Sequence, residues 1–396
     1  MKVLFISALT PYPLYSGGQV RTFNLLSRLS KHHEITLVTF LRNPSEVQYE
    51  KQLPFVKKII TQYRGHAWQP GYVVGSLMGS KPLLLTSYDH PQLRAAIARE
   101  LASDSYDLIH IEPWYVWPSV PEVTIPVIAA THNIEHEVYM QFAKSVRWSL
   151  LRPGYYWDVW KLRCWEQEVW KRAARVIAVS DDDARTIATS VGPERVRIVP
   201  NGVDTKAYRP VIRKRVGSPV FLFVGSFMWM QNRDAVSWLL SSIWPELRRR
   251  HPGSILRIIG RNMPEGLRRL TTGGHIELME QVEDVADEFH RADMLLAPIR
   301  IGGGTSFKIL EAMASGLPVV TTSLGATGMH VTSGEEVRIA NTSQEFTDAV
   351  AYLVKNPGEY IRMARQARAL IEREYNWDAI SSVLDRVWYE TAKQHH

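Results

Sequence analysis

Cysteine is nearly absent from this chain, and the shortage limits its redox chemistry. One cysteine, Cys164, occurs among 396 residues, so no disulfide can form within the chain. A chain with so little cysteine is typical of a reducing compartment, and we expect a cytoplasmic protein. We interpret Cys164 itself as a small buried apolar residue.

Clusters of metal-ligating residues are missing as well. No group of histidine, cysteine, aspartate and glutamate has the spacing of a metal site. Three consecutive acids occur in SDDDAR at 180–185, and we interpret them as a helix N-cap followed by first-turn acids that complement the helix dipole. We therefore expect a protein that needs neither a metal ion nor a bound cofactor.

Long apolar runs do not occur. No stretch approaches the roughly 20 apolar residues that a membrane span requires. The N-terminal run at 3–9 is short for a signal peptide and has no small-x-small cleavage site, so we interpret it as a first β-strand.

The formal net charge of +7 favours anionic partners, namely nucleotides, phosphates or an anionic membrane surface. Because the sequence contains no zinc spacing and no aromatic RNA-binding strand, we do not expect nucleic acid among them.

Short apolar runs alternate with helical patterns along the whole chain. A chain of 396 residues is too long for one ordinary core, so two domains are predicted. Several runs are apolar on both faces, as in strands buried within a parallel sheet. The alternation indicates an α/β protein with two doubly wound sheets. The candidate strands are 3–9, 35–40, 107–111, 126–131 and 175–180 in the first half, and 219–225, 254–260, 275–279, 293–299 and 317–322 in the second.

Two segments mark the limits of the domains. The stretch 201–219 is basic, ends in glycine and proline and shows no clear period, so it is the candidate linker. The tail at 377–394 repeats apolar residues at steps of three and four, which predicts an amphipathic helix that docks on another part of the chain. Its apolar positions are Trp377, Ile380, Leu384, Val387, Trp388 and Thr391.

The segment PIRIGGGTSFKILEAMASGLPVV at 298–320 is the richest in chemical information. Three glycines, 302–304, let the backbone approach a ligand, and Thr305 or Ser306 can cap a helix that runs to about Ser315. A helix start attracts phosphate. Glu311 lies six residues after Thr305, roughly 9 Å along the axis, which suits a carboxylate that binds a ribose near a diphosphate. Lys308 can meet phosphate or pair with Glu311.

The same segment also has a purely structural interpretation. A glycine turn can open a core helix whose solvated face carries Glu311, and spacing alone does not decide between the two. Three glycines match neither the P-loop pattern nor the GxGxxG pattern.

Taken together, these motifs resemble the family-four glycosyltransferases. The stretch APIRIGGGTSFKILEAMASGLPVV is similar to their donor-site signature, and further similar motifs follow in the expected order over nearly the whole chain. They lie at 16–30, 110–114, 130–137, 177–187, 199–204, 224–239 and 373–380. The resemblance implies a GT-B fold, with two Rossmann-like domains that face a central cleft. It also implies an acceptor-binding domain at 1–205, a donor-binding domain at 206–375 and a C-terminal helix at 376–396 that packs back on the first domain.

The resemblance also assigns roles to individual residues. Glu311 matches the acid that binds the donor ribose, and His132 matches the histidine that faces the reacting sugar. The donor site would further include Gly17, Gly18, Gly225, Ser226, Arg233, Gly303, Gly304, Thr305, Ser306 and Lys308. Lys308 would join His132 and Glu311 in catalysis by stabilising charge on the leaving diphosphate.

Other assignments depart from the family pattern or stay open. The family often has an acid at the position of Gly303 and an Arg and a Lys where this chain has Ser226 and its neighbours, so Lys308 or Arg233 would supply the positive charge. Glu112 is a candidate for acceptor binding. Arg21 either binds phosphate or acceptor, or simply solvates its helix.

A basic and aromatic stretch at 147–172 has two interpretations. It holds five of the thirteen tryptophans and six basic residues against three acidic ones. Such a stretch suits a peripheral contact with a membrane, at its inner face, or with a lipid-linked acceptor. In the alternative, Trp157, Trp160, Cys164 and Val169 pack into the domain.

The resemblance thus implies a glycosyltransferase of the retaining hexosyltransferase type. It would transfer a sugar from a nucleotide-diphosphate donor to a hydroxyl of a glycan, a glycolipid or a polysaccharide precursor. The alternatives are a GT-B nucleotide-sugar epimerase, a phosphorylase, or an inactive module that binds nucleotide sugars.

Overall fold

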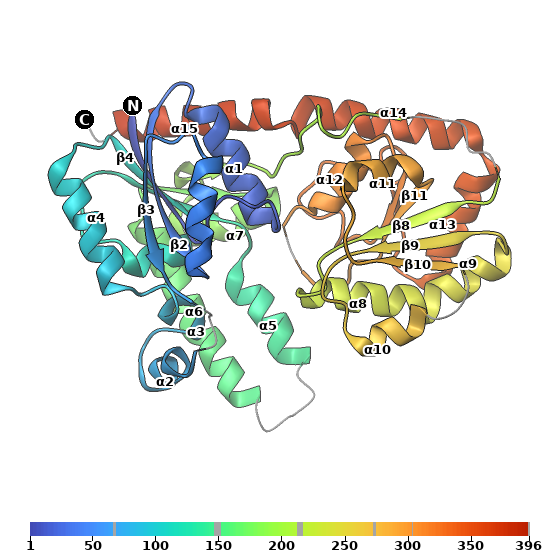
Figure 1. Ribbon diagram of the computed structural model, residues 1–396, viewed down its shortest axis with the longest axis horizontal. Coiled ribbons are helices and arrows are strands. Elements are labelled where there is room, and N and C mark those ends of the chain that lie inside the picture. The colour runs from blue at the N-terminus through green and yellow to red at the C-terminus, as the bar shows by residue number, and fades with distance from the viewer. Residues whose placement is uncertain (66–68, 146–151, 212–216, 272–274, 303, 395–396) are drawn as a thin grey trace. The chain divides into compact units, whose positions relative to one another are not determined.

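The computed structural model describes residues 1–65, 69–145, 152–211, 217–271, 275–302 and 304–394 (Figure 1). The chain divides into two units. Unit 1 comprises Met1–Pro200 and Ile380–His396, and unit 2 comprises Asn201–Ala379. Each has its own parallel sheet with helices packed against it, as the alternation of strand and helix patterns predicts.

Unit 1 is built on seven parallel strands in the order β3-β2-β1-β4-β5-β6-β7. The sheet reverses its winding between β1 and β4, where a doubly wound fold normally binds its ligand. The strands are β1 Lys2–Ser7, β2 Glu34–Leu41, β3 Lys58–Tyr63, β4 Leu108–Glu112, β5 Val127–Thr131, β6 Arg175–Ala178 and β7 Val196–Ile198. The helices are α1 Gly17–Leu29, α2 Pro70–Met78, α3 Leu83–Thr86, α4 Pro91–Ser103, α5 Glu135–Ser145, α6 Arg152–Arg172 and α7 Asp181–Val191.

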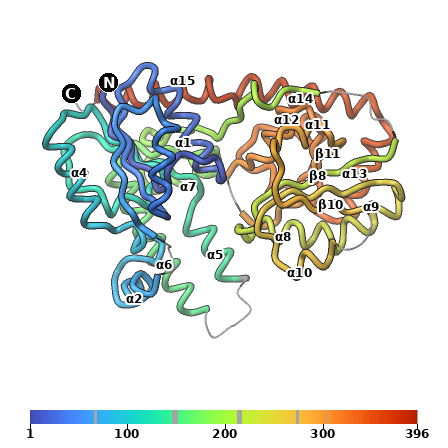
Figure 2. Tube along the Cα trace, in the orientation of Figure 1, coloured from blue at the N-terminus to red at the C-terminus, as the bar shows by residue number. Residues whose placement is uncertain are grey.

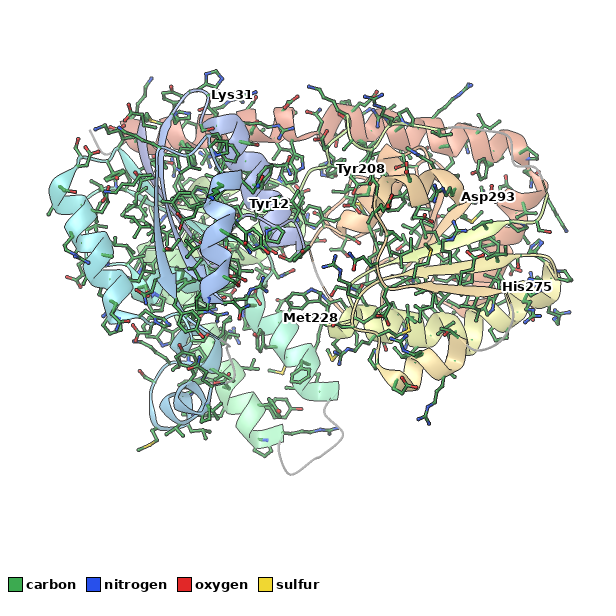
Figure 3. The ribbon with its side chains drawn as sticks, viewed as in Figure 1. Tyr12, Lys31, Tyr208, Met228, His275 and Asp293 are labelled. Carbon is green, nitrogen blue, oxygen red and sulfur yellow. The ribbon has the colours of Figure 1, made fainter. Side chains whose placement is uncertain are left out.

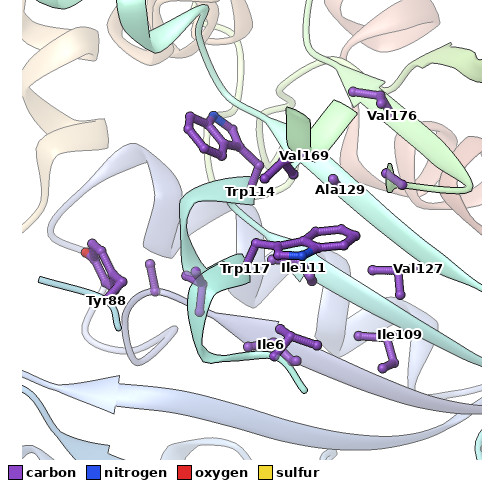
Figure 4. Close-up of a cluster of buried hydrophobic side chains, with 14 of the residues drawn as sticks. Ile6, Tyr88, Ile109, Ile111, Trp114, Trp117, Val127, Ala129, Val169 and Val176 are labelled. Atoms are coloured by element: carbon purple, nitrogen blue, oxygen red, sulfur yellow. The ribbon is translucent and has the colours of Figure 1, made fainter. Parts of the chain in front are cut away.

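One core of unit 1 packs the sheet against α4, α6, α7 and the short 3-10 helix that follows β4. Trp114 and Trp117 of this helix, Trp114–Ser119, are buried among apolar side chains of the central strands (Figure 4). Ile109 and Ile111 come from β4, and Val127 comes from β5. Two indoles against β-branched side chains bury a large apolar area, which fixes the loop that follows β4.

Unit 2 repeats the plan with six parallel strands in the order β10-β9-β8-β11-β12-β13. Successive residues of β8 face opposite sides, as strand geometry requires: Phe221 and Phe223 join one core and Leu222 joins the other. The strands are β8 Val220–Val224, β9 Ile255–Ile259, β10 Ile276–Met279, β11 Met294–Ala297, β12 Val319–Thr321 and β13 Arg338–Ile339. The helices are α8 Met230–Trp238, α9 Trp244–Arg250, α10 Glu265–Arg268, α11 Val285–Arg291, α12 Phe307–Ala314, α13 Ser343–Lys355 and α14 Pro357–Glu374.

All ten strands expected from apolar runs are present, and three strands were not expected. β3, KIITQY, is half-buried at the edge of its sheet and so lacks a continuous apolar run. β7 and β13 contain only three and two residues, too few for any period to show.

The C-terminal helix α15, Trp377–Lys393, confirms the amphipathic pattern of the tail. Its predicted apolar positions are all buried. From Ile380 onward this helix belongs to unit 1, where His33 contacts Asp385 at 2.5 Å between Nε2 and Oδ1. The chain therefore starts and ends in the same unit.

The expected linker is largely a packed part of unit 2. The amide of Val203 donates to the carbonyl of Tyr375 at 2.8 Å, and the ring of Tyr208 packs edge-on against Phe289. Tyr208 is labelled in Figure 3. Residues 212–216 lie outside the described part, so only 201–211 and 217–219 can be compared with the expectation.

Two expectations for α6 are wrong. Cys164 is exposed rather than buried, and Trp157 and Trp160 are exposed rather than packed into the domain. Val169 is buried, as expected. The helix buries a different stripe, which includes Val159, Leu162 and Glu166, and at 100° per residue Cys164 falls on the opposite side.

Candidate functional site

The expected site residues of unit 1 gather at the carboxyl end of the sheet. Ser7 at the end of β1 pairs with Glu112 at the end of β4, and His132 directly follows β5. Gly17 and Gly18 begin α1 after β1. In a parallel sheet these ends share one edge, which is where ligands of doubly wound folds bind.

Glu112 is the centre of a buried polar cluster. Its Oε1 accepts from Nε of Arg21 at 2.7 Å and lies 2.5 Å from Nε2 of His132, while its Oε2 lies 2.8 Å from Nε2 of His110. Burial alone would raise the pKa of Glu112. The Arg21 guanidinium and the two histidines outweigh burial and hold that pKa well below its usual value. Glu112 is therefore a carboxylate at neutral pH.

The hydrogen bonds of this cluster assign the protons on both histidines. The indole Nε1 of Trp388, which can only donate, donates to Nδ1 of His110 at 3.0 Å. Burial lowers the pKa of His110, so it is neutral and its single proton lies on Nε2, facing Glu112. Since Glu112 is an acceptor, His132 also carries a proton on Nε2. When His132 is neutral, its Nδ1 then holds the acceptor lone pair.

Two residues of α1 contact this cluster: Gly18 lies against His132, and Arg21 contacts Glu112. A Cβ at Gly18 would lie 3.6 Å from Cε1 and 3.8 Å from Nδ1 of His132, so the backbone of the glycine loop lies against this ring. Arg21 also donates from Nη1 to the carbonyl of Pro200 at 2.8 Å, and its side chain is 1% exposed. Arg21 thus holds the carboxylate of Glu112 rather than solvating its helix.

The expected donor residues of unit 2 follow β8 and β11, the neighbouring strands where this sheet reverses. Gly225 and Ser226 follow β8, and the glycine loop follows β11. Gly302 and Gly304 have φ of 130° and 66°, values that favour glycine. Gly303 lies outside the described residues.

The start of α12 differs in detail from the expected cap. Ser306 occupies the N-cap position without a side-chain hydrogen bond to the helix. The hydroxyl of Thr305 instead donates to the carbonyl of Gly328 at 3.3 Å. The first-turn amides of a helix have no intrahelical acceptor, so this start keeps the donors that an anion would need.

Lys308 is tied to the loop after β8 by a residue that the sequence did not single out. Its Nζ donates to Oδ1 of Asn232 at 2.5 Å, and Nδ2 of Asn232 donates to the carbonyl of Ser226 at 2.8 Å. A Cβ at Gly225 would lie 2.7 Å from Cγ of Asn232, so only glycine leaves room for this contact. Asn232 therefore joins Gly225, Ser226 and Lys308 into one cluster, while Arg233 next to it donates from Nε to the carbonyl of Phe227.

Lys308 and Glu311 lie one turn apart on α12 and influence each other. Burial lowers the pKa of Lys308 to about 7, although the Glu311 carboxylate favours the charged form. Burial also raises the pKa of Glu311 to about 7, against the opposing effects of a hydrogen bond with the Tyr208 hydroxyl and of Lys308. Two half-buried groups that both titrate near neutrality are typical of a functional site.

Three residues that support the site, Asn232, Tyr208 and Trp388, were not predicted from the sequence. Asn232 adjoins Arg233, a predicted donor residue, so proximity in the chain was the available signal. Tyr208 lies in the segment interpreted as a linker, and Trp388 is 278 residues from His110. Nothing local in the sequence marks such distant partners.

Two family models cover most of the chain. The model of Glycosyltransferase Family 4 matches residues 15–207, and the model of Glycosyl transferases group 1 matches residues 218–356. Among curated proteins, the phosphatidyl-myo-inositol mannosyltransferase of Mycobacterium leprae is 29% identical over 320 residues. The match covers 76% of this chain and 78% of that protein.

Solved structures share the fold of the whole chain. The sucrose-phosphate synthase of Thermosynechococcus elongatus superposes with a TM-score of 0.76 at 17% identity, covering 98% of this chain and 99% of that one. A structure of HepE from Anabaena in complex with UDP and glucose gives a TM-score of 0.68 at 14% identity, with coverages of 98% and 99%. These likenesses confirm the expected GT-B fold.

Proposed function

Because this chain belongs to glycosyltransferase family 4, we propose that it transfers a hexose from a nucleotide-diphosphate donor to a hydroxyl of a glycan, glycolipid or polysaccharide precursor. Transfer would retain the anomeric configuration and need neither a metal ion nor a cofactor. The observation that carries the proposal is the cluster in unit 2, where Lys308, tied by Asn232 to Ser226, lies one turn before Glu311 at the start of α12.

Unit 2 supplies groups for each part of a nucleotide diphosphate. The backbone amides at the start of α12 and the Lys308 ammonium favour the diphosphate, and they favour it more as negative charge develops on leaving. Glu311 would accept hydrogen bonds from two ribose hydroxyls. Gly302 and Gly304 would let the backbone approach the ligand without a side chain between.

Unit 1 would bind the acceptor and the sugar being transferred. The His132 side chain is 20% exposed, whereas those of Arg21, His110 and Glu112 are at most 1% exposed, so His132 is the member of its cluster that can reach a ligand. Glu112 and Arg21, expected to bind acceptor, are both 1% exposed. We therefore assign them a positioning role: Glu112 orients His132, and Arg21 keeps Glu112 ionised and fixed.

The relatives support a nucleotide-sugar donor and a lipid-linked acceptor in general terms. HepE has been solved with UDP and glucose, and the mycobacterial relative is named for transfer of mannose to a phosphatidylinositol. Neither fixes the sugar or the nucleotide for this chain. A cytoplasmic location, at the inner face of a membrane, is part of the proposal.

The test is a thermal unfolding series with UDP, GDP, ADP and their sugars, followed by product analysis with the stabilising donor. A ligand at one hundred times its Kd stabilises by about 2.7 kcal/mol, which raises the midpoint by several degrees. We expect one nucleotide to stand out and its sugar to be transferred or hydrolysed, with and without EDTA. Stabilisation without any turnover would support an inactive binding module, and no stabilisation by any nucleotide would refute the proposal.

The pH dependence of donor binding follows from the two shifted groups. Binding requires the charged form of both, but Glu311 is protonated below a pKa of about 7 and Lys308 is neutral above a pKa of about 7. Affinity for the nucleotide sugar is therefore expected to peak near neutral pH. On each side it should decrease, and the decrease should approach about tenfold per pH unit. Calorimetric titration from pH 5.5 to 9 measures this change in affinity.

Two variants test the acidic and alkaline sides of this pH profile separately. Lys308→Arg keeps its charge at all these pH values and should remove the loss of affinity above neutral pH. Glu311→Gln should remove the loss of affinity below neutral pH. A nucleotide sugar is used rather than a nucleotide diphosphate because it has no secondary phosphate ionisation near neutrality. A flat profile in the wild type would contradict the assignment of both groups.

A further inference from the structure

A groove runs between α5 and α6, two helices of unit 1 that lie side by side in Figures 1 and 2. It encloses about 340 Å³, which is within the range of small-ligand sites. Each helix turns one face to the groove, because the residues that line it recur at steps of three and four. They include His136, Met140 and Lys144 on α5, and Tyr156, Trp160 and Arg163 on α6.

A buried carboxylate fixes His136 in this groove. Oε2 of Glu166 on α6, a side chain that is 0% exposed, lies 2.5 Å from Nδ1 of His136. The two oxygens of Glu166 also accept the backbone amides of Glu135 at 2.9 Å and of His136 at 3.3 Å. Because both oxygens act as acceptors, Nδ1 of His136 is the donor. When His136 is neutral, its Nε2 therefore keeps a lone pair that can accept a hydrogen bond from a ligand.

Aromatic side chains of α6 form the opposite wall. Trp160 is 55% exposed and Tyr156 is 38% exposed. The ring of Trp160 stacks on that of Trp157, with centroids 4.9 Å apart and planes 19° apart, which fixes its orientation. A fixed and exposed ring offers a flat apolar surface at low cost in side-chain entropy. The C–H face of a sugar ring packs on such a surface, while the sugar hydroxyls stay at its rim and can reach polar groups.

Three charged side chains of the groove have no counterion within the described part of the chain. Lys144, Arg163 and Glu137 line the groove, are exposed, and form no ion pair with any described residue. Lysine and arginine only donate hydrogen bonds, and a carboxylate only accepts them. The groove therefore offers both donors and acceptors, as sugar hydroxyls require, since each hydroxyl does both. Two cations against one carboxylate favour a sugar that carries an acid group.

We propose that this groove binds an acidic sugar unit of the acceptor, one that carries a carboxylate or a phosphate. The sugar ring would pack on Trp160, a hydroxyl would donate to Nε2 of His136, and the acid group would pair with Lys144 and Arg163. Because α5 begins three residues after His132, the groove starts close to the loop that would face the transferred sugar. The inference rests on the proposed function and deepens it, since it names the chemical class of the acceptor.

The polar groups of the groove favour a sugar over an apolar occupant. An acyl chain or an apolar helix would cover the Glu137 carboxylate and Nε2 of His136 without bonding to them, and a covered polar group without a hydrogen bond is costly. A sugar instead supplies hydroxyls to both. Residues 147–151, part of the stretch first associated with a membrane, lie outside the described residues, and the proposed sugar site uses none of them.

The test is saturation-transfer NMR of the full chain with three sugars that differ only at C6. Glucuronic acid has a carboxylate there, glucose 6-phosphate has a phosphate, and glucose has a neutral hydroxyl. We expect transfer to the ring protons of the acidic sugars, and affinity for glucose about fivefold lower because glucose lacks the ion pair. The acidic sugar that binds more tightly identifies the acid group.

Substitutions on the two helices separate the contributions to sugar binding. Tyr156→Ala with Trp160→Ala should lower the affinity for all three sugars roughly tenfold, because the ring loses the surface on which it packs. His136→Ala should lower all three about fivefold through the loss of one hydrogen bond. Lys144→Gln with Arg163→Gln should lower the affinity for the acidic sugars to that for glucose and leave glucose unchanged. High salt should have the same effect on the wild type.

Exposed residues elsewhere in unit 1 provide matched controls. Lys31→Gln with Arg99→Gln removes two cations, and Tyr389→Ala removes an aromatic ring, so both should bind the sugars as the wild type does. Glu311→Ala changes the proposed donor site and leaves the groove intact, so it too should bind them. Thermal unfolding with nucleotides stays the separate test of the proposed function, and its outcome does not alter the sugar measurement.

Three results would overturn the proposed sugar site. The first is a wild type that transfers saturation to none of the three sugars. The second is an equal loss of binding in the control variants or in Glu311→Ala, which would place the sugar elsewhere on the protein. The third is a dimer in sedimentation equilibrium that Trp160→Ala dissociates, which would assign the groove to self-association.

Discussion

Replacing Glu112 by alanine is expected to destabilise unit 1 by about 3–5 kcal/mol and to remove nearly all transfer activity. The carboxylate is 1% exposed and is shared by Arg21, His110 and His132. Its removal leaves the Arg21 guanidinium, itself 1% exposed, without its carboxylate partner in a buried place. Equilibrium denaturation, followed by a probe of unit 1, measures the loss.

The size of this effect depends on burial, and an exposed ion pair of the same unit provides the control. Lys57 and Glu34 are 2.5 Å apart between Nζ and Oε2, but their side chains are 54% and 53% exposed. Glu34→Ala should therefore lower the stability of unit 1 far less than Glu112→Ala does. Equal losses in Glu112→Ala and Glu34→Ala would contradict the account of the buried cluster.

The double variant Arg21→Met with Glu112→Leu tests whether the cost arises from the unpaired charge. Two apolar side chains leave no buried guanidinium, so we expect the double variant to be more stable than Glu112→Ala. It should nevertheless be inactive, because His132 has lost the acceptor that orients it. Recovery of stability without recovery of kcat would establish Glu112 as a positioning residue, whereas recovery of both would exclude that role.

Replacing Glu311 by alanine is the second change with a large expected effect. A carboxylate that accepts two hydroxyl hydrogen bonds contributes roughly 1.5–3 kcal/mol for each bond. We therefore expect nucleotide affinity to fall by at least about a hundredfold. A second loss adds to it: the Glu311 carboxylate favours the charged form of Lys308, so its removal lowers the pKa of Lys308 further and weakens the diphosphate site.

Calorimetric titration with the nucleotide identified by thermal unfolding checks this prediction. Glu265→Ala, at an exposed position of α10 in the same unit, should bind the nucleotide as the wild type does. Glu311→Gln keeps the shape of the side chain and should bind with intermediate affinity. Unchanged binding by Glu311→Ala would leave α12 as a core helix opened by a glycine turn, which is the structural interpretation of this segment.

The sequence by itself determined ten of the thirteen strands that the structure describes, the helix after the glycine loop and the amphipathic C-terminal helix. Each depends on a local pattern. An apolar run such as 219–225 is long enough to identify a buried strand, and residues at steps of three and four define one face of α15. The positive φ of Gly302 and Gly304 is likewise a local requirement that only glycine meets easily.

Only the tertiary structure decided which groups support the site. Asn232 meets Lys308 across 76 residues, and Trp388 fixes the proton of His110 across 278 residues. Such pairs form when strands and helices pack, and no periodic pattern in the sequence predicts them. The same holds for exposure: Trp157 and Trp160 have the spacing of a core stripe, but α6 presents a different side to the sheet because Leu162, Glu166 and Val169 face inward.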